Sequence, residues 1–419
     1  MPEAVIVAAT RSPIGRAVKG SLADIRPDDL AAQVVEAALA RVPELPRDSI
    51  EDLILGCGRP GGEQGFNLGR VVATLIGLDG LPGTTVSRYC ASSLQSTRMA
   101  FHAIRAGEGE VFVSAGVECT SRAFRGTSDN PPVEQEADTR DRANNPWTND
   151  RFSDAQAITK LRGAAGAPPW SDPRLDGRLP DIYIAMGQTA ENVSQICGVS
   201  RTEQDEFAAL SQNRAEAALD TGFWADEITP IVHGDGSLVG ADDSPRRGVT
   251  RAALAALKPV FRPDGTVTAG NCCPLNDGAA ALVIMSDRRA RELAITPLAR
   301  IVSSAVTALS PEVMGLGPVE SCRRALALAG MTVDDIDLVE MNEAFAAQVL
   351  ASQRQLGIKL DRLNVNGGAI AVGHPFGMTG ARIATTLIHS LRAHDKQLGI
   401  ETMCVGGGQG MALILERLS

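Results

Sequence analysis

The chain has 419 residues, of which 44% are hydrophobic and 21% charged. This predicts a globular protein of two or three domain-sized units, and with only 4% aromatic residues its core must consist mainly of Ala, Val, Leu and Ile. The net charge of -10 argues against nucleic acid or an anionic membrane as the main partner, because both favour basic surfaces.

The first residues and the apolar runs predict no membrane segment. Residues 1–11 contain no basic stretch leading into a long apolar one, so we expect no signal peptide. The longest apolar runs, such as 279–285, are too short to cross a bilayer. We therefore expect a cytoplasmic protein. The eight Cys lack metal-type CxxC spacing, so free thiols and no metal site are predicted.

The first 120 residues alternate short apolar runs with longer amphipathic ones. Leu94, Thr97, Phe101 and Ile104 recur at helical spacing. Alternating strands and helices predict a mainly parallel sheet covered on both faces. Strands are predicted at 4–9, 53–56, 84–86 and 111–116, and a further helix at 27–41.

The pattern changes at about residue 121. Residues 121–180 are polar and rich in Pro, Arg and Asp without a clear period, which is typical of a long functional loop. Helical periodicity returns later, and strand–helix alternation resumes after about residue 298. Helices are predicted at 188–197, 202–219, 319–329, from 343 onward and around 383–391, and strands at 300–306, 336–340, 402–405 and 411–415.

The two ends of the chain resemble each other. In each, a run containing Ala or Gly precedes a reactive residue at the start of a long helix, Cys90 in one and His374 in the other. We interpret this as an internal duplication around an inserted middle. The predicted units are a first half at 1–121, completed by about 276–297, an insertion at 122–275, and a second half at 298–419.

Cys90 stands at a predicted strand–helix junction. The free N–H groups and positive dipole at a helix N-terminus favour a thiolate, so its pKa is predicted to fall below the usual value of about 8.5. A buried, inert Cys is the alternative interpretation.

Three other segments combine reactive residues with glycines or with a helix start. His374 lies in the glycine-rich run 366–377, and Cys404 precedes three consecutive glycines, which allow close backbone approach. Asn342 opens the run Asn-Glu-Ala-Phe-Ala, where it either caps a helix or faces a substrate. A satisfied polar His and a simple hairpin turn are the alternatives for the first two segments.

Together these four motifs resemble those of the thiolase family. The runs 187–192, 265–271 and 276–280 also match the family, so the resemblance covers essentially the whole chain. It implies an α/β thiolase fold with two similar βαβαβαββ halves, each carrying a five-stranded sheet, in α/β/α/β/α layers. The inserted loop domain would bind CoA.

The resemblance also implies a two-step mechanism. Cys90 would attack a 3-ketoacyl-CoA, His374 would accept the thiol proton, and Cys404 would serve as general acid and base. One oxyanion site would consist of His374 and a water held by Asn342, and a second of the backbone N–H groups of Cys90 and Gly406. CoA is implied as a substrate, with no permanently bound cofactor.

The CoA contacts carry over less directly. Arg246 is expected near the adenine or phosphate end of CoA, while Met314 and Phe345 are expected to line the pocket or to pack in the core. Cys273 stands where relatives often have Ser, and we expect it near the pantetheine. Ser93 replaces a more frequent Gly, and we expect its hydroxyl to cap the helix after Cys90.

The pattern around Cys90 is similar to that of degradative thiolases acting on bulky or branched acyl groups, including those from steroid side chains. An acetoacetyl-CoA thiolase and a non-catalytic acyl-CoA-binding protein are the alternatives. Decarboxylating ketoacyl synthases share the fold but lack a second reactive Cys such as Cys404. The resemblance further implies a homodimer or homotetramer.

Overall fold

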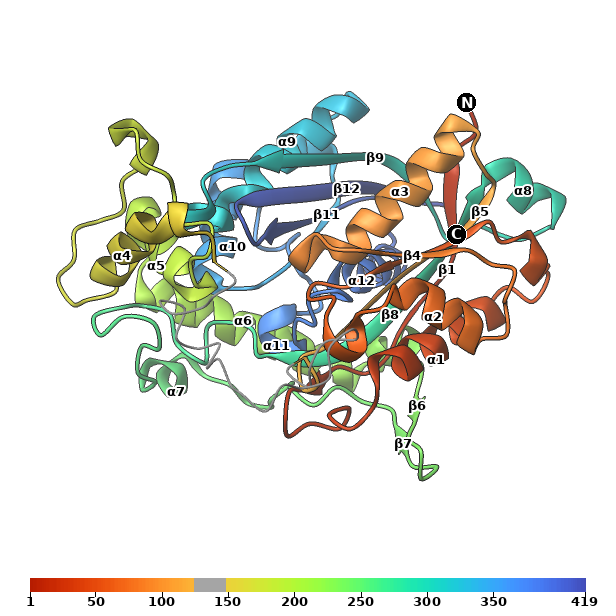
Figure 1. Ribbon diagram of the computed structural model, residues 1–419, viewed down its shortest axis with the longest axis horizontal. Helices are drawn as coiled ribbons and strands as arrows, with labels where there is room; N and C mark the ends of the chain where they lie inside the picture. Colours follow the sequence, from red (N-terminus) through yellow and green to blue (C-terminus); the bar gives the residue numbers. More distant parts are fainter. Residues whose placement is uncertain (124–147) are drawn as a thin grey trace.

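The computed structural model describes residues 1–123 and 148–419. Its main feature is a ten-stranded sheet with the strand order β10-β11-β12-β9-β1-β8-β5-β3-β4, in which β2 pairs with β8 beside this path. A helical layer covers each outer face, and two helices lie between the halves (Figure 1). This agrees with the predicted α/β fold of stacked layers.

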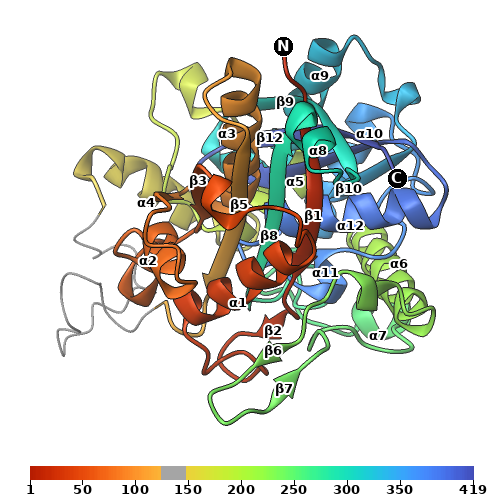
Figure 2. The same cartoon turned by 90° about the vertical axis from the view of Figure 1, so that its right-hand side faces the viewer.

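The first half contributes the strands from β4 to β1 in that order. Every residue of β1, β5 and β8 is buried, which explains why these strands are continuous apolar runs. Helices α1 and α2 pack on one face, and α3 packs on the other (Figure 2). The elements are β1 (Ala4–Arg11), β2 (Gly15–Arg16), α1 (Pro27–Ala40), β3 (Asp52–Gly56), α2 (Leu68–Leu75), β4 (Gly83–Val86), α3 (Ser92–Ala106), β5 (Val111–Cys119), β8 (Asn276–Ser286) and α8 (Asp287–Glu292).

The second half repeats this arrangement. Strands β10 and β11 are parallel, as are β3 and β5, and β11, β12 and β9 follow with the same directions as β5, β8 and β1. The elements are β9 (Ala299–Ala308), α9 (Gly317–Ala329), β10 (Leu338–Met341), α10 (Ala346–Leu356), α11 (Ala369–Val372), α12 (Thr379–Ala393), β11 (Leu398–Val405) and β12 (Gln409–Arg417). The counterpart of β4 is reduced to one bridge between Val339 and Leu363.

Two expectations about the sheet are wrong. The sheet is mixed, because among the described strands only the pairs β3–β4, β3–β5 and β10–β11 are parallel. The last strand of each half returns antiparallel, a direction that an apolar run does not reveal. The halves also do not carry separate five-stranded sheets, since β1 pairs with β9 through Val5–Arg300 and Ile6–Ala299.

Helices α3 and α12 meet between the two halves of the sheet. A Cβ atom on Gly380 of α12 would come within 3 Å of the backbone of Leu94 in α3, so the contact requires glycine for space. The Ser93 hydroxyl accepts a 2.9 Å hydrogen bond from the Ala381 N–H. Ser93 therefore satisfies a donor in the first turn of the other half's helix, and the expected cap on its own helix is wrong.

The middle segment contains α4 (Ser153–Arg162), α5 (Met186–Cys197), α6 (Arg201–Asp220), β6 (Ile231–Val232), β7 (Leu238–Val239) and α7 (Arg251–Ala255). Helices α5 and α6 of the middle segment pack against α10 of the second half, whereas β6 lies against α1 of the first half (Figure 1, Figure 2). Helix α4 lies where no period was predicted, and residues 124–147 of that polar stretch are outside the described residues. No helix in the described ranges combines the length and apolar character needed to cross a bilayer.

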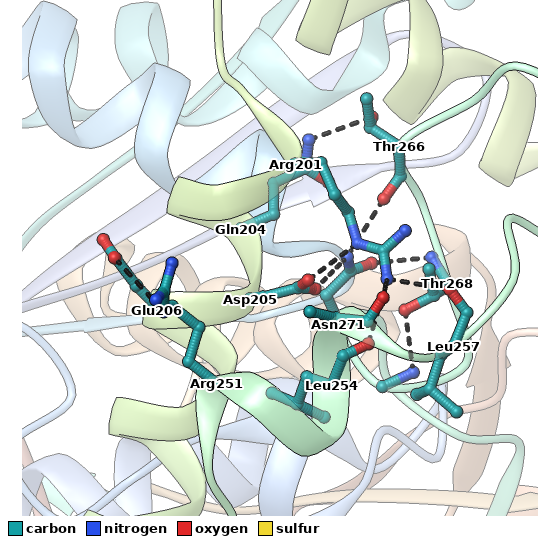
Figure 3. A network of polar contacts seen from close by, with 12 residues as sticks. Arg201, Gln204, Asp205, Glu206, Arg251, Leu254, Leu257, Thr266, Thr268 and Asn271 are labelled. Carbon is teal, nitrogen blue, oxygen red and sulfur yellow. Dashed lines mark hydrogen bonds and ion pairs between the residues drawn. The ribbon is translucent and has the colours of Figure 1, made fainter.

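A polar network lies within the middle segment (Figure 3), and a backbone hydrogen bond links it to the second half. Asp205 accepts from Arg201 at 2.7 Å and from the Asn271 amide at 3.0 Å. The Asn271 carbonyl in turn accepts from the Ala346 N–H at the start of α10. The segment that follows Asn271 is thereby fixed beside the Asn342–Ala346 motif, where the backbones of Cys272 and Phe345 form an antiparallel β-bridge.

Replacing Gly380 with Ala should destabilise the protein by at least about 2 kcal/mol, because the added methyl group overpacks a backbone contact. Gly80→Ala is the matched control, since nothing lies within 4 Å of a Cβ at that position, and its effect should stay within about 0.5 kcal/mol. Urea unfolding midpoints measure both. Equal midpoints for the two variants would contradict the close approach of α3 and α12.

Candidate active site

A cavity of about 300 Å³ opens beside Cys90. Its lining includes Cys90, from the first half of the chain, and Gly406 and Gly407, from the second half. The remaining described wall is mostly aliphatic or aromatic. It is formed by Arg59, Tyr89, Thr148, Ile182, Tyr183, Ile184, Met186 and Phe376.

Local hydrogen bonds hold Cys90 on a short 3-10 turn, Tyr89–Ala91, that leads into α3. The Ser92 hydroxyl accepts from the Arg88 N–H and donates to the Tyr89 carbonyl. Tyr89 has a φ of +44°, a strained value for a residue with a side chain. The Arg88 guanidinium bonds to Gln409 at 2.5 Å, which ties the turn to the glycine-rich loop of the second half.

The backbone N–H of Gly406 lies close to the Cys90 sulfur and favours its thiolate form. Burial nevertheless raises the pKa of the Cys90 thiol, and so does the carboxylate of Glu118. Together they outweigh the lowering effect of the N–H groups and Arg59, so that the pKa is about 11. The predicted fall below about 8.5 is therefore wrong. The N–H donors are present, but loss of hydration outweighs them.

His374 is buried and neutral. Thr379 donates its hydroxyl to the Pro375 carbonyl and so accepts from His374 Nδ1 at 2.6 Å. This leaves Nε2 as the unprotonated nitrogen. Burial and the nearby Arg382 guanidinium lower the pKa of His374 to about 3. A neutral imidazole has a free lone pair, but its low pKa makes it a weak base rather than one poised near neutrality.

Asn342 lies beside His374. Its Nδ2 is 3.2 Å from His374 Nε2, and its backbone N–H donates to the Thr402 carbonyl at 2.9 Å. The Asn342 Oδ1 atom is buried and has no hydrogen-bond partner among the described residues. Asn342 precedes α10 but does not cap it, since Phe345 holds the cap position without a side-chain bond.

Cys404 is completely buried near the end of β11. Burial and the neighbouring Cys90 thiol raise its pKa well above the ordinary value. Met314 and Phe345 pack with it in one small cluster, and Cys273 packs against that cluster. These three predicted ligand contacts thus surround Cys404, although none of them lines the cavity at Cys90.

Arg246 is not brought to this cavity. Its side chain is exposed, and its backbone N–H donates to Gln212 at 3.0 Å. Its contact with CoA stays a prediction. Within the described ranges, no group of three or more His, Cys, Asp or Glu side chains is arranged to hold a metal ion.

Glu118 and Arg59 lie at this site but belong to none of the motifs recognised in the sequence. Glu118 is completely buried and accepts from the N–H groups of Gly58 and Gly377 at 2.8 and 2.9 Å and from Gln64 at 3.2 Å. A lone acidic residue in an apolar strand was the available signal. Arg59 lies in an aperiodic loop, where no sequence pattern marks it.

Comparisons with known proteins match the chain along its whole length. The model of the thiolase N-terminal domain matches residues 4–158 and 173–288, and that of the thiolase C-terminal domain matches residues 295–417. A 3-ketoacyl-CoA thiolase of Bacillus subtilis is 40% identical over 99% of this chain and 100% of its own length. An acetyl-CoA acetyltransferase of Pseudomonas aeruginosa is 42% identical over 100% of both chains.

A solved structure agrees with these matches. The crystal structure of human mitochondrial 3-ketoacyl-CoA thiolase in complex with CoA superposes with a TM-score of 0.83 and 34% identity, covering 100% of this chain and 98% of that one.

Alkylation of Cys90 by iodoacetamide should accelerate about tenfold per pH unit from pH 6 to 9, because the reactive thiolate fraction rises in that proportion below a pKa of about 11. His374 should add no inflection in this range, since its pKa is about 3. Mass spectrometry of the Cys90 peptide measures the rate. A plateau near pH 7 would show instead a thiolate stabilised in the resting enzyme.

Proposed function

Because this chain belongs to the thiolase family and is an acyltransferase of that family, we propose that it is a 3-ketoacyl-CoA thiolase. It would cleave its substrate with free CoA to acetyl-CoA, or propionyl-CoA, and a shortened acyl-CoA. The observation that carries this proposal is the placement of the Cys90 sulfur against the Gly406 N–H, at the floor of a cavity. Cys404 lies next to that sulfur.

In the first half-reaction, Cys90 Sγ attacks the C3 carbonyl carbon and its proton passes to His374 Nε2. The bond between C2 and C3 then breaks, which leaves an acyl thioester on Cys90 and the enolate of acetyl-CoA. Cys404 donates its proton to the C2 carbon of that enolate, and acetyl-CoA departs. The high pKa of Cys404 supports this role, because a group that holds its proton in the resting enzyme is available as an acid.

In the second half-reaction, the thiol of CoA loses its proton to the Cys404 thiolate and attacks the thioester carbon. The bond to Cys90 breaks, the Cys90 thiolate takes back the proton held by His374 Nε2, and the shortened acyl-CoA leaves. Each tetrahedral intermediate carries negative charge on one oxygen. The N–H groups of Cys90 and Gly406 are proposed to stabilise one such oxygen, and His374 with a water held by Asn342 the other.

The resting protonation states constrain the first step. A complete transfer from a thiol of pKa about 11 to an imidazole of pKa about 3 is strongly unfavourable in the free enzyme. We therefore propose that the proton moves as the carbon–sulfur bond forms, when charge shifts from the sulfur to an oxygen held by N–H donors.

The acyl group is proposed to be bulky or branched, as in fatty acid or steroid side-chain β-oxidation. The sequence around Cys90 supports this, and so do the large apolar or aromatic side chains that line the cavity. Among the described residues they are Tyr89, Ile182, Tyr183, Ile184, Met186 and Phe376. An acetoacetyl-CoA-specific thiolase is the second candidate, because some relatives carry the name acetyl-CoA acetyltransferase.

Cleavage of 3-ketoacyl-CoA esters should require free CoA and strengthen from acetoacetyl-CoA to longer and branched substrates, because larger acyl groups bury more apolar surface in the cavity. Following the loss of each substrate spectroscopically gives kcat/KM across the panel. In the absence of CoA, substrate should leave an acyl mass increment on Cys90. Cys404→Ser should lower kcat by roughly 10²–10⁴, whereas Cys197→Ser, at the end of α5, serves as the matched control.

Each other outcome has a distinct meaning. Equal or better use of acetoacetyl-CoA would keep the mechanism and reject the bulky-substrate proposal. Affinity for CoA esters without cleavage or a covalent mass increment would favour the non-catalytic binding protein.

The assembly is proposed to be a homodimer or homotetramer, as the family resemblance implies. Size-exclusion chromatography with light scattering should give twice or four times the chain mass of 43.9 kDa. A single species at 43.9 kDa, unchanged over a hundredfold range of concentration, would refute this.

A further inference from the structure

Arg59 is the only charged side chain among the described residues that line the cavity at Cys90. The other described lining groups are apolar side chains, the phenol rings of Tyr89 and Tyr183, the Thr148 side chain, the Cys90 thiol and glycine backbone. Arg59 is itself exposed, so its guanidinium lines the cavity and is accessible to a ligand that enters from solvent.

The guanidinium of Arg59 is not occupied by a structural ion pair. Among residues 1–123 and 148–419, no carboxylate lies within 4 Å of it, and it donates no hydrogen bond. The central carbon of the guanidinium lies over the Phe376 ring, 5.6 Å from its centroid. The nearby Glu118 carboxylate is already committed, since it accepts the Gly58 and Gly377 N–H groups and the Gln64 amide.

The loop that carries Arg59 is nevertheless held firmly. The Arg59 carbonyl accepts from the Gln64 amide at 2.9 Å, and the adjacent Gly58 N–H is bound to the buried Glu118. A Cβ atom on Gly58 would come within 3 Å of Phe376, so the loop packs directly on the segment after His374. The backbone position of Arg59 is thereby set relative to the reacting groups.

The chemistry at Cys90 determines what meets Arg59. The C3 carbon of the substrate must reach Cys90, and the acyl chain beyond C3 must extend into the space that the cavity provides. Ile182, Ile184 and Met186 suit its carbon atoms. An anionic group on that chain would meet the guanidinium, which binds a carboxylate through two parallel hydrogen bonds.

We propose that Arg59 determines substrate specificity by pairing with a carboxylate on the acyl chain, so that the preferred substrates are 3-ketoacyl-CoA esters of dicarboxylic acids. This inference rests on the proposed thiolase function and names its substrate class. The carboxylate stays unchanged in the reaction, and cleavage yields acetyl-CoA and the CoA monoester of a dicarboxylic acid shortened by two carbons. A bulky or branched carbon skeleton between the thioester and the carboxylate fits the same cavity.

The test compares 3-oxoadipyl-CoA with 3-oxohexanoyl-CoA, which have the same chain length and differ in the terminal carboxylate. The wild-type kcat/KM should favour the carboxylated ester by at least about tenfold, in line with a charged hydrogen bond. Arg59→Met should bring this ratio close to one, and Arg59→Lys should retain part of it. Arg324→Gln, at an exposed arginine of α9, should keep the wild-type ratio.

The ratio of the two kcat/KM values tests whether Arg59 binds the substrate carboxylate. Contacts with the CoA phosphates and the attack by Cys90 are the same for both esters, so they do not change this ratio. If Arg59→Met slows both substrates equally, Arg59 serves CoA or the thiol, and the proposal is overturned. If the wild-type enzyme cleaves neither ester, the proposed function fails instead. Calorimetry with adipyl-CoA and hexanoyl-CoA, which lack the 3-keto group, still tests Arg59: tighter binding of adipyl-CoA that is lost in Arg59→Met supports the proposal, and equal affinities reject it.

Discussion

Glu118 accepts hydrogen bonds from both halves of the chain, and the geometry of the site depends on this. Its buried carboxylate holds the Gly58 N–H from the first half and the Gly377 N–H from the second. These charge-assisted bonds offset the cost of burying the charge. They hold the loop at Gly58 against the segment that carries His374. The two halves approach closely here, because a side chain on Gly116 or Gly377 would collide with the backbone of the other half.

The same enclosure sets the chemical state of the thiols. Burial and the charge of Glu118 keep Cys90 protonated at rest, while the Gly406 N–H stands ready for negative charge. A protonated thiol reacts slowly with oxidants and alkylating agents. The site thus favours a thiol that becomes nucleophilic in the presence of substrate over one that is reactive at all times. The bond from Arg88 to Gln409 helps to hold this arrangement in place, together with the strained backbone at Tyr89 that it includes.

Much of the fold could be predicted because periodicity and turn residues are local. The strand predicted at 111–116 lies within β5, and the helix predicted from Leu94, Thr97, Phe101 and Ile104 is α3. The layered fold with two similar halves is confirmed. Strand direction was not predictable, because a buried run has the same composition whether it is parallel or antiparallel. The bond from Ala381 to Ser93 was missed for a similar reason, since a serine near a helix start suggests a cap on its own helix.

The sequence motifs located the residues proposed for chemistry but not their environment. The sign of the Cys90 pKa shift depends on how completely distant segments exclude water, which no motif near residue 90 records. Arg59 shows the same limit, because its significance comes from the cavity wall and not from its neighbours in the chain. The roles assigned to Cys90, His374, Cys404, Asn342 and Gly406 stay predictions.

The pairing of β1 with β8 also has a consequence for biosynthesis. Residues 4–11 find their partners only at 280–286, and β9 lies later still. At about 5–20 residues per second, ribosomes take between roughly 15 and 50 s to make the intervening chain. During that interval the apolar first strand has no sheet neighbour, and an unpaired strand of this kind is a target for aggregation. During this period, a chaperone bound to the nascent chain would favour folding over aggregation.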